Sequence, residues 1–198
     1  MTNLQQRITN PQFFINNAIV VAQRLLNKYL VRIIDGKKII ARIVEVEAYD
    51  GSTDDANHAF NNKRTARNET LFWKGGFVHI FIIYGMYYCL NFVCDQENYP
   101  SAVLIRACEI ISDERDEAFQ PNFKLANGPG KVCRYLKIDK TNDGLDLLTN
   151  DELFLLDNED LPPSAIVTTP RINVDYATVA KDYLYRFYIK NNPAISKK

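Results

Sequence analysis

Residues that bind metals or form disulfides are scarce in this sequence. The 198 residues include only four cysteines and two histidines. The cysteines form no CxxC pair, and their spacing to the histidines matches no zinc finger or zinc ribbon. We therefore expect four free, mostly buried thiols in a reducing compartment, with no metal and no cofactor.

The sequence also has little that would carry it to a membrane. Its first ten residues lack a basic stretch followed by an apolar one, so no signal peptide is expected. The most apolar run, residues 77–93, is too short for a transmembrane helix and is interrupted by His79, Gly85 and Asn91. These features predict a cytoplasmic protein with no membrane partner.

Net charge is absent, because 24 Lys and Arg balance 24 Asp and Glu. A globally basic nucleic-acid binder is therefore excluded, although a local basic patch is not. Residues 61–74 carry four basic residues and one acidic residue, whereas residues 107–120 carry one basic residue and five acidic residues. This segregation is typical of a protein with a basic face and an acidic back.

The chain length and the lack of a long linker predict a single domain, and the residue patterns predict that it mixes helices with antiparallel hairpins. A helix is expected from Asn10-Pro11 to about residue 27, an acidic helix ends near Phe119, and a short helix follows the glycine-rich residues 127–131. A hairpin is expected at Asp35-Gly36. The predicted strands are 29–34, 37–49, 77–83, 86–93, 101–107, 153–156 and 165–169.

These elements place the chain in the mixed α/β (α+β) class, with one domain over residues 1–198. We expect a curved, mostly antiparallel sheet with flanking helices and a protruding β-hairpin. In the strand 37–49, Glu45, Glu47 and Tyr49 share one face, opposite an apolar face. Carboxylates two residues apart on a strand lie roughly 6.5–7 Å apart, which suits an inverting glycosidase. A solvated surface is the alternative interpretation of that face.

Five sequence features occur in an order that points to one family. They are RIVEVEAYDG (42–51), the following His58, IIYGMYYCLN (82–91), LIRA (104–107) and NGPGK (127–131). Together they resemble the alkyladenine/3-methyladenine DNA glycosylase family over most of the chain. The resemblance implies a monofunctional DNA glycosylase of base excision repair that acts as a nucleoid-associated monomer on double-stranded DNA. Its substrates would be damaged purines: 3-methyladenine, 7-methylguanine, and deaminated or etheno purines.

The resemblance also assigns the chemistry. Glu47 would be the general base that deprotonates the water attacking C1′. An N3- or N7-alkylated purine is already cationic before it leaves, so its departure needs little or no acid assistance. Arg106 would point into the site and hold a phosphate or the carboxylate, and the alternative for Arg106 is an ordinary salt bridge.

The same resemblance predicts a pocket for an extruded base. Tyr49 and Phe81 would stack on the base, although the family usually has tyrosine where Phe81 stands. His58 would contact the flipped nucleotide, and Asn91 would exclude the amino group of guanine. The alternatives are an exposed loop histidine and an asparagine that only bonds main-chain groups of its hairpin.

The remaining predicted contacts are with the DNA itself. Tyr84, flanked by Met86 at a hairpin tip, would intercalate where the base has left, unless it is simply a turn tyrosine. The candidate phosphate contacts are Lys63, Arg64, Arg67, Lys131 and Arg171. A bifunctional lyase would need a pocket lysine, which the Glu47 and Tyr84 motifs lack. A non-catalytic nucleic-acid binding module, which would not need Glu47, is the alternative function.

Overall fold

The computed structural model describes residues 6–83 and 85–197, and over these residues it has eight strands and two α-helices. The strands are β1 (Tyr29–Ile34), β2 (Lys37–Tyr49), β3 (Val78–Ile83), β4 (Tyr87–Val93), β5 (Ala102–Asp113), β6 (Leu153–Leu156), β7 (Ile166–Thr169) and β8 (Arg186–Ile189). The helices are α1 (Ala18–Leu25) and α2 (Pro129–Tyr135).

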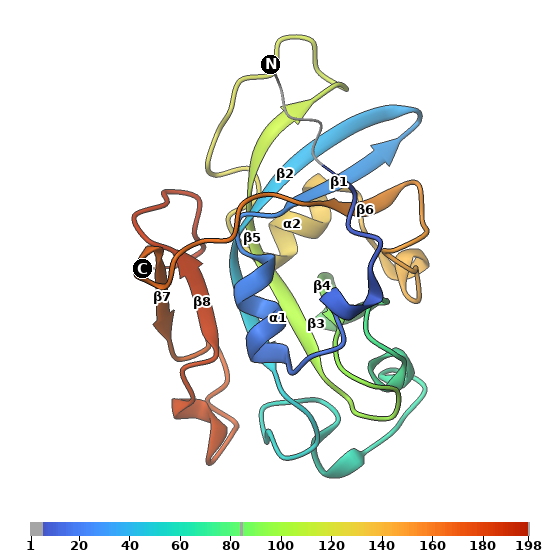
Figure 1. Cartoon of the computed structure of the whole chain (residues 1–198), viewed down its shortest axis with the longest axis vertical. Helices are drawn as coiled ribbons and strands as arrows, with labels where there is room; N and C mark the ends of the chain where they lie inside the picture. Colours follow the sequence, from blue (N-terminus) through green and yellow to red (C-terminus); the bar gives the residue numbers. More distant parts are fainter. Residues whose placement is uncertain (1–5, 84, 198) are drawn as a thin grey trace.

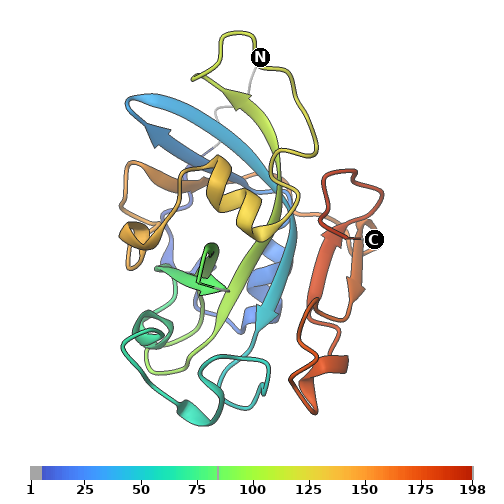
Figure 2. The same cartoon turned by 180° about the vertical axis from the view of Figure 1, so that it is seen from behind.

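All strands belong to one antiparallel sheet in the order β3-β4-β5-β2-β1-β6, while β8 pairs with β2 and β7 pairs with β8. The sheet is strongly curved, and its β7–β8 hairpin forms one flank near the C-terminus (Figure 1). Helix α1 packs on β2 and β5, and α2, seen in front in Figure 2, packs on β4 and β5. The expected α+β class and the curved antiparallel sheet are confirmed.

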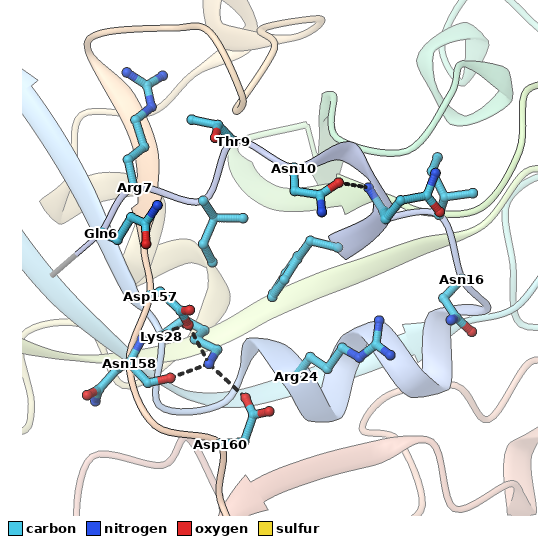
Figure 3. Close-up of a pocket in the computed structure, with 14 residues that line it drawn as sticks. Gln6, Arg7, Thr9, Asn10, Asn16, Arg24, Lys28, Asp157, Asn158 and Asp160 are labelled. Atoms are coloured by element: carbon cyan, nitrogen blue, oxygen red, sulfur yellow. Dashed lines mark hydrogen bonds and ion pairs between the residues drawn. The ribbon is translucent and has the colours of Figure 1, made fainter.

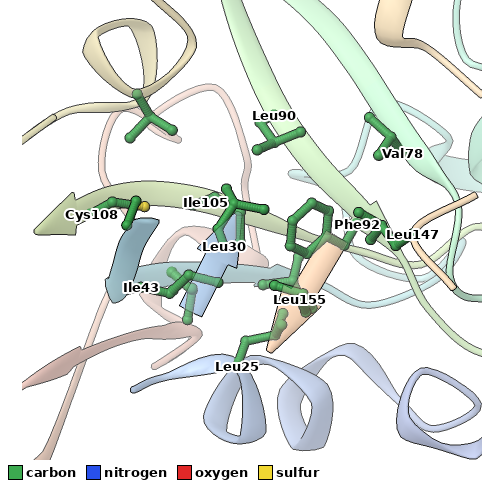
Figure 4. Close-up of a cluster of buried hydrophobic side chains, with 14 of the residues drawn as sticks. Leu25, Leu30, Ile43, Val78, Leu90, Phe92, Ile105, Cys108, Leu147 and Leu155 are labelled. Atoms are coloured by element: carbon green, nitrogen blue, oxygen red, sulfur yellow. The ribbon is translucent and has the colours of Figure 1, made fainter. Parts of the chain in front are cut away.

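The core lies where the two helices meet the sheet. Leu25 of α1, Ile43 of β2 and Ile105 of β5 are at most 1% exposed in one apolar cluster (Figure 4). Two cysteines, Cys108 and Cys133, belong to the same cluster. All four cysteines are free and buried, which confirms the expectation from their spacing.

Strand β2 is the centre of the sheet and positions the site. Its first half pairs with β1, and Glu45, Val46 and Glu47 pair on the same side with β8. On its other side it pairs with β5 over nearly its whole length. Both edges of β2 are therefore occupied where the two glutamates lie.

Three expected elements differ from the structure. Asn10 caps only the 3₁₀ turn Pro11–Phe13. Helix α1 begins at Ala18, and its N-cap is Asn17, whose side chain accepts a hydrogen bond from the Val20 N–H. Asparagine side chains at 16 and 17 bond to local backbone N–H groups and so interrupt a helix that would otherwise begin at Pro11.

The acidic segment is also a strand rather than a helix. Strand β5 continues to Asp113 because the long β2 offers partners up to Ile39, and alternate residues such as Cys108 and Ile110 face the core. The last strand, β8, lies in the segment expected to be a basic tail. Among the described residues, no helix is both long and apolar enough to span a bilayer.

Candidate active site

Glu47 is completely buried, and three donors orient its carboxylate. The Tyr49 hydroxyl and Arg106 Nη1 donate to Oε2 at 3.0 and 3.1 Å, and the Ile172 main-chain N–H donates to Oε1 at 2.7 Å. Tyr49, Arg106 and Ile172 all line a cleft of about 780 Å³. Glu47 thus lies directly beneath the cleft wall, in a fixed orientation.

The electrostatics of Glu47 suit a proton acceptor. Burial raises the pKa of its carboxyl above the ordinary value of 4.5, and the Arg106 charge, the Ile172 N–H and the Tyr49 hydroxyl only partly oppose that effect. Each carboxylate oxygen can accept two hydrogen bonds, and among the described residues Oε1 has only the Ile172 donor. Oε1 therefore has an acceptor position that no donor among the described residues uses.

A second buried carboxylate holds Arg106 in place. Glu45 Oε1 accepts hydrogen bonds from Arg106 Nε at 3.3 Å, Arg186 Nε at 2.7 Å and Ser196 Oγ at 2.8 Å. The Ser196 N–H donates to Glu45 Oε2 at 2.5 Å. Arg106 thus bridges Glu45 and Glu47, so the two glutamates share a face as predicted, but that face is covered rather than solvated.

Irregular pairing of β2 with β5 aims Arg106 at this site. The register shifts between Ile43 and Glu45 and again between Glu45 and Val46, which leaves Arg106 as an extra residue of β5. Such β-bulges bend a strand and redirect a side chain, and they are common beside active sites. Sequence alternation alone cannot locate a bulge of this kind.

The structure corrects the prediction that Arg171 contacts a DNA phosphate. It is 5% exposed, and its guanidinium bonds Asp54 twice, at 2.5 and 2.8 Å, together with the main-chain oxygens of Ala48 and Ala180. Its Cζ also lies 4.6 Å from the Tyr49 ring centroid. Arg171 therefore supports Tyr49 from inside the protein, and its donors are not available to DNA.

The predicted base-pocket residues come together at one end of the cleft. His58 stacks on Phe81 with ring centroids 3.8 Å apart, and both residues line the cleft with Tyr49. Desolvation and the nearby His79 lower the pKa of His58. An inner pocket of about 60 Å³ continues from these rings and is also lined by Asn91.

Asn91 is turned toward its own hairpin. Its amide nitrogen donates to the main-chain oxygens of His79 and Cys89, both at 3.1 Å. Its side chain nevertheless lines the inner pocket, so both the main-chain role and the predicted exclusion of guanine are compatible with this position.

The predicted DNA contacts are placed unevenly. Tyr84 lies outside the described residues, and its neighbour Met86 is 67% exposed. Lys63 and Arg67 are exposed, whereas Arg64 is engaged in a bidentate pair with Glu69. At the cleft itself, Lys131 donates to Asn127 at 2.7 Å. Arg134, which the sequence analysis did not select, also lines the cleft, one helical turn beyond Lys131.

A cavity of similar size lies elsewhere in the described structure. It measures about 830 Å³ and lies between the N-terminal segment, α1 and residues 157–160 (Figure 3). Its buried cation, Lys28, is already paired with Asp157 and Asp160 at 2.7 Å. It contains none of the predicted site residues, and the described residues contain no cluster of three metal-ligating side chains. The 780 Å³ cleft is therefore the candidate active site.

A restrained, buried carboxylate can act as a general base, and an aromatic cleft with basic residues on its wall suits the bases and phosphates of a nucleic acid. A model of the methylpurine-DNA glycosylase family matches residues 12–193. The chain belongs to that family. It is a DNA glycosylase, a hydrolase of N-glycosidic bonds, and its substrate partner is DNA.

Several relatives with names from this family match the chain over nearly its full length. A protein of Natranaerobius thermophilus named "Putative 3-methyladenine DNA glycosylase" is 41% identical over 191 residues, which cover 93% of this chain and 96% of the relative. Proteins of the same name from Desulfitobacterium hafniense and Borreliella burgdorferi are each 43% identical, over 94% of this chain and 97% and 98% of their own lengths.

Proposed function

We propose that this protein is a monofunctional 3-methyladenine DNA glycosylase that acts as a monomer on double-stranded DNA. The observation that carries the proposal is the buried carboxylate of Glu47, which three cleft-lining donors hold with one acceptor position open. The names of the relatives support the choice of 3-methyladenine. 7-Methylguanine and deaminated or etheno purines belong to the range to be tested.

The reaction follows from the cleft. A glycosylase reaches its target by rotating the nucleotide out of the duplex, and Tyr49, Phe81 and His58 offer aromatic faces for the extruded base. Tyr84 and Met86 would fill the space left in the duplex. Apart from Arg171, the basic residues selected above, together with Arg134, would contact the phosphates.

The chemical step is a hydrolysis at C1′. Glu47 Oε1 accepts a proton from a water molecule whose oxygen forms a bond to C1′. The bond between C1′ and the purine nitrogen breaks, and its electron pair stays with the base. Because an N3-alkylated adenine is already cationic, it leaves as a neutral base without an acid catalyst. The product is an abasic site.

Base release from single-lesion duplexes tests the proposal. Glu47→Gln should lower single-turnover release of 3-methyladenine by roughly 10²–10⁴-fold, the usual contribution of a general base, while lesion-DNA binding stays within about tenfold. Glu159→Gln, at an exposed position outside the cleft, is the matched control and should behave like the wild type. Wild-type-like release by Glu47→Gln would refute the assignment.

Two further results would identify the alternatives. A wild-type protein that binds DNA but releases no damaged base would be a non-catalytic binding module. Trapping of a covalent DNA adduct by borohydride would indicate a lysine nucleophile and hence a bifunctional lyase. We expect neither.

A further inference from the structure

His79 lies at the inner end of the proposed base pocket and has one unsatisfied ring nitrogen. It pairs with Asn91 across β3 and β4, and both side chains line the inner pocket with Tyr49 and Phe81. The side chain is only 2% exposed, and Nε2 is buried without a hydrogen-bond partner among the described residues. A buried polar atom without a partner is costly, so a ligand that satisfies it is favoured.

The other ring nitrogen fixes the tautomer. Nδ1 is 2.5 Å from Thr70 Oγ1 and 3.5 Å from Asp143 Oδ1, and the Thr70 hydroxyl donates to Asp143 at 3.3 Å. Although burial works against it, hydrogen bonds from His79, the Ile80 N–H and Lys140 hold the pKa of Asp143 well below its usual range. Asp143 is therefore an ionised acceptor. Since the Thr70 proton points to Asp143, the hydrogen between Thr70 and His79 belongs to Nδ1, and in the neutral imidazole Nε2 is then a lone-pair acceptor.

We propose that His79 is a specificity-determining residue whose Nε2 accepts a hydrogen bond from the exocyclic amino group of a 6-aminopurine. This inference rests on the proposed function. In N3-methylated adenine the 6-amino group carries the only N–H donors of the base, so this is the group that can satisfy Nε2. The inner pocket holds only a few water molecules at about 10–30 Å³ each, which fits the edge of a base rather than a whole ring.

A 6-ketopurine presents a hydrogen-bond acceptor to Nε2 in place of the donor that Nε2 needs. Hypoxanthine would present a carbonyl oxygen to the Nε2 lone pair, which loses the hydrogen bond and places two acceptors together. Sites built to pair with a substrate N–H discriminate strongly against analogues that lack it. We expect His79 to contribute about 10- to 100-fold to the preference for 3-methyladenine over hypoxanthine.

The first test needs no substitution. The chain has only two histidines, so ¹⁵N spectra of the wild-type imidazoles contain two ring systems, and a His58→Gln sample assigns them. At neutral pH the His79 ring should show a protonated Nδ1 and an unprotonated Nε2. A protonated Nε2 in the free protein would overturn the proposal.

The second test compares single-turnover release from duplexes that differ only in carrying 3-methyladenine or hypoxanthine. In His79→Gln the amide can turn to donate to a keto oxygen, so the 3-methyladenine to hypoxanthine rate ratio should fall at least tenfold relative to the wild type. Thr70→Val keeps His79 but removes the hydroxyl that fixes its tautomer, and it should move the ratio in the same direction. Unchanged ratios in both variants would refute the role of His79, whereas release of neither base by the wild type would refute the proposed function itself.

Discussion

Replacing Glu45 with glutamine tests whether the buried network behind the site is a positioning device. Glu45, Glu47, Arg106 and Arg186 form a group of two carboxylates and two guanidiniums whose formal charges sum to zero, and each residue is at most 7% exposed. Glu45→Gln leaves that group with one excess buried positive charge. The new amide N–H₂ group also replaces an oxygen that accepted hydrogen bonds. In one orientation of the amide it faces the donors of the two arginines at the former Oε1 position, and in the other it faces the Ser196 N–H at the former Oε2 position.

Breaking a buried ion network by removing one partner costs about 3–5 kcal/mol. With a urea dependence of roughly 2–3 kcal/mol per molar, the unfolding midpoint should fall by about 1–2.5 M. The matched control is Glu109→Gln. Glu109 also pairs with an arginine across the β2–β5 ladder, but its side chain is 29% exposed, so the loss should stay below about 1 kcal/mol.

A second readout separates positioning from stability. Without Glu45, Arg106 is free to pair more fully with Glu47, which lowers the pKa of Glu47. In single-turnover assays under folded conditions, the maximum rate should fall while the acidic limb of the pH–rate profile moves to lower pH. A folded Glu45→Gln protein with wild-type rate and an unmoved acidic limb would refute the reasoning, because Arg106 would then need no support.

Three further results are expected. Because burial raises the pKa of Glu47 and the base must be ionised, wild-type activity should fall as pH drops through an apparent pKa above 4.5; a limb at or below 4.5 in single-turnover rates would contradict this. Arg171→Met breaks a buried pair with Asp54, so it should lower the free energy of unfolding in urea by about 3–5 kcal/mol and leave the salt dependence of DNA binding unchanged. Arg67→Ala should instead reduce the magnitude of the slope of log K against log[salt] by about 1. The opposite pattern would restore Arg171 as a phosphate contact. Asn91→Ser should raise release of normal guanine roughly 10- to 100-fold relative to 3-methyladenine, and parallel losses on both bases would leave Asn91 only its main-chain role.

The sequence by itself determined the local elements of the sheet. Two runs rich in β-branched residues predicted β1 and β2, and Asp35-Gly36 predicted their hairpin, whose two turn residues have φ of 52° and 74° as such a turn requires. Alternation also placed Glu45, Glu47 and Tyr49 on one face. The family resemblance selected four of the residues that line the cleft: Tyr49, His58, Phe81 and Arg106. These features follow from neighbours within a few positions along the chain, and this is the range over which periodicity and turn chemistry act.

Only the tertiary structure decided what covers that face. Ile172 donates to Glu47 from 125 positions away, and Ser196 donates to Glu45 from 151 positions away. Without these segments the two glutamates would be solvated, as the alternative interpretation held; with them, both carboxylates are buried and the pKa of Glu47 rises. Arg171 is turned inward for the same reason, since Asp54 neutralises it there. Side-chain periodicity defines which residues share a face, but burial and its electrostatic consequences depend on long-range packing that no local pattern contains.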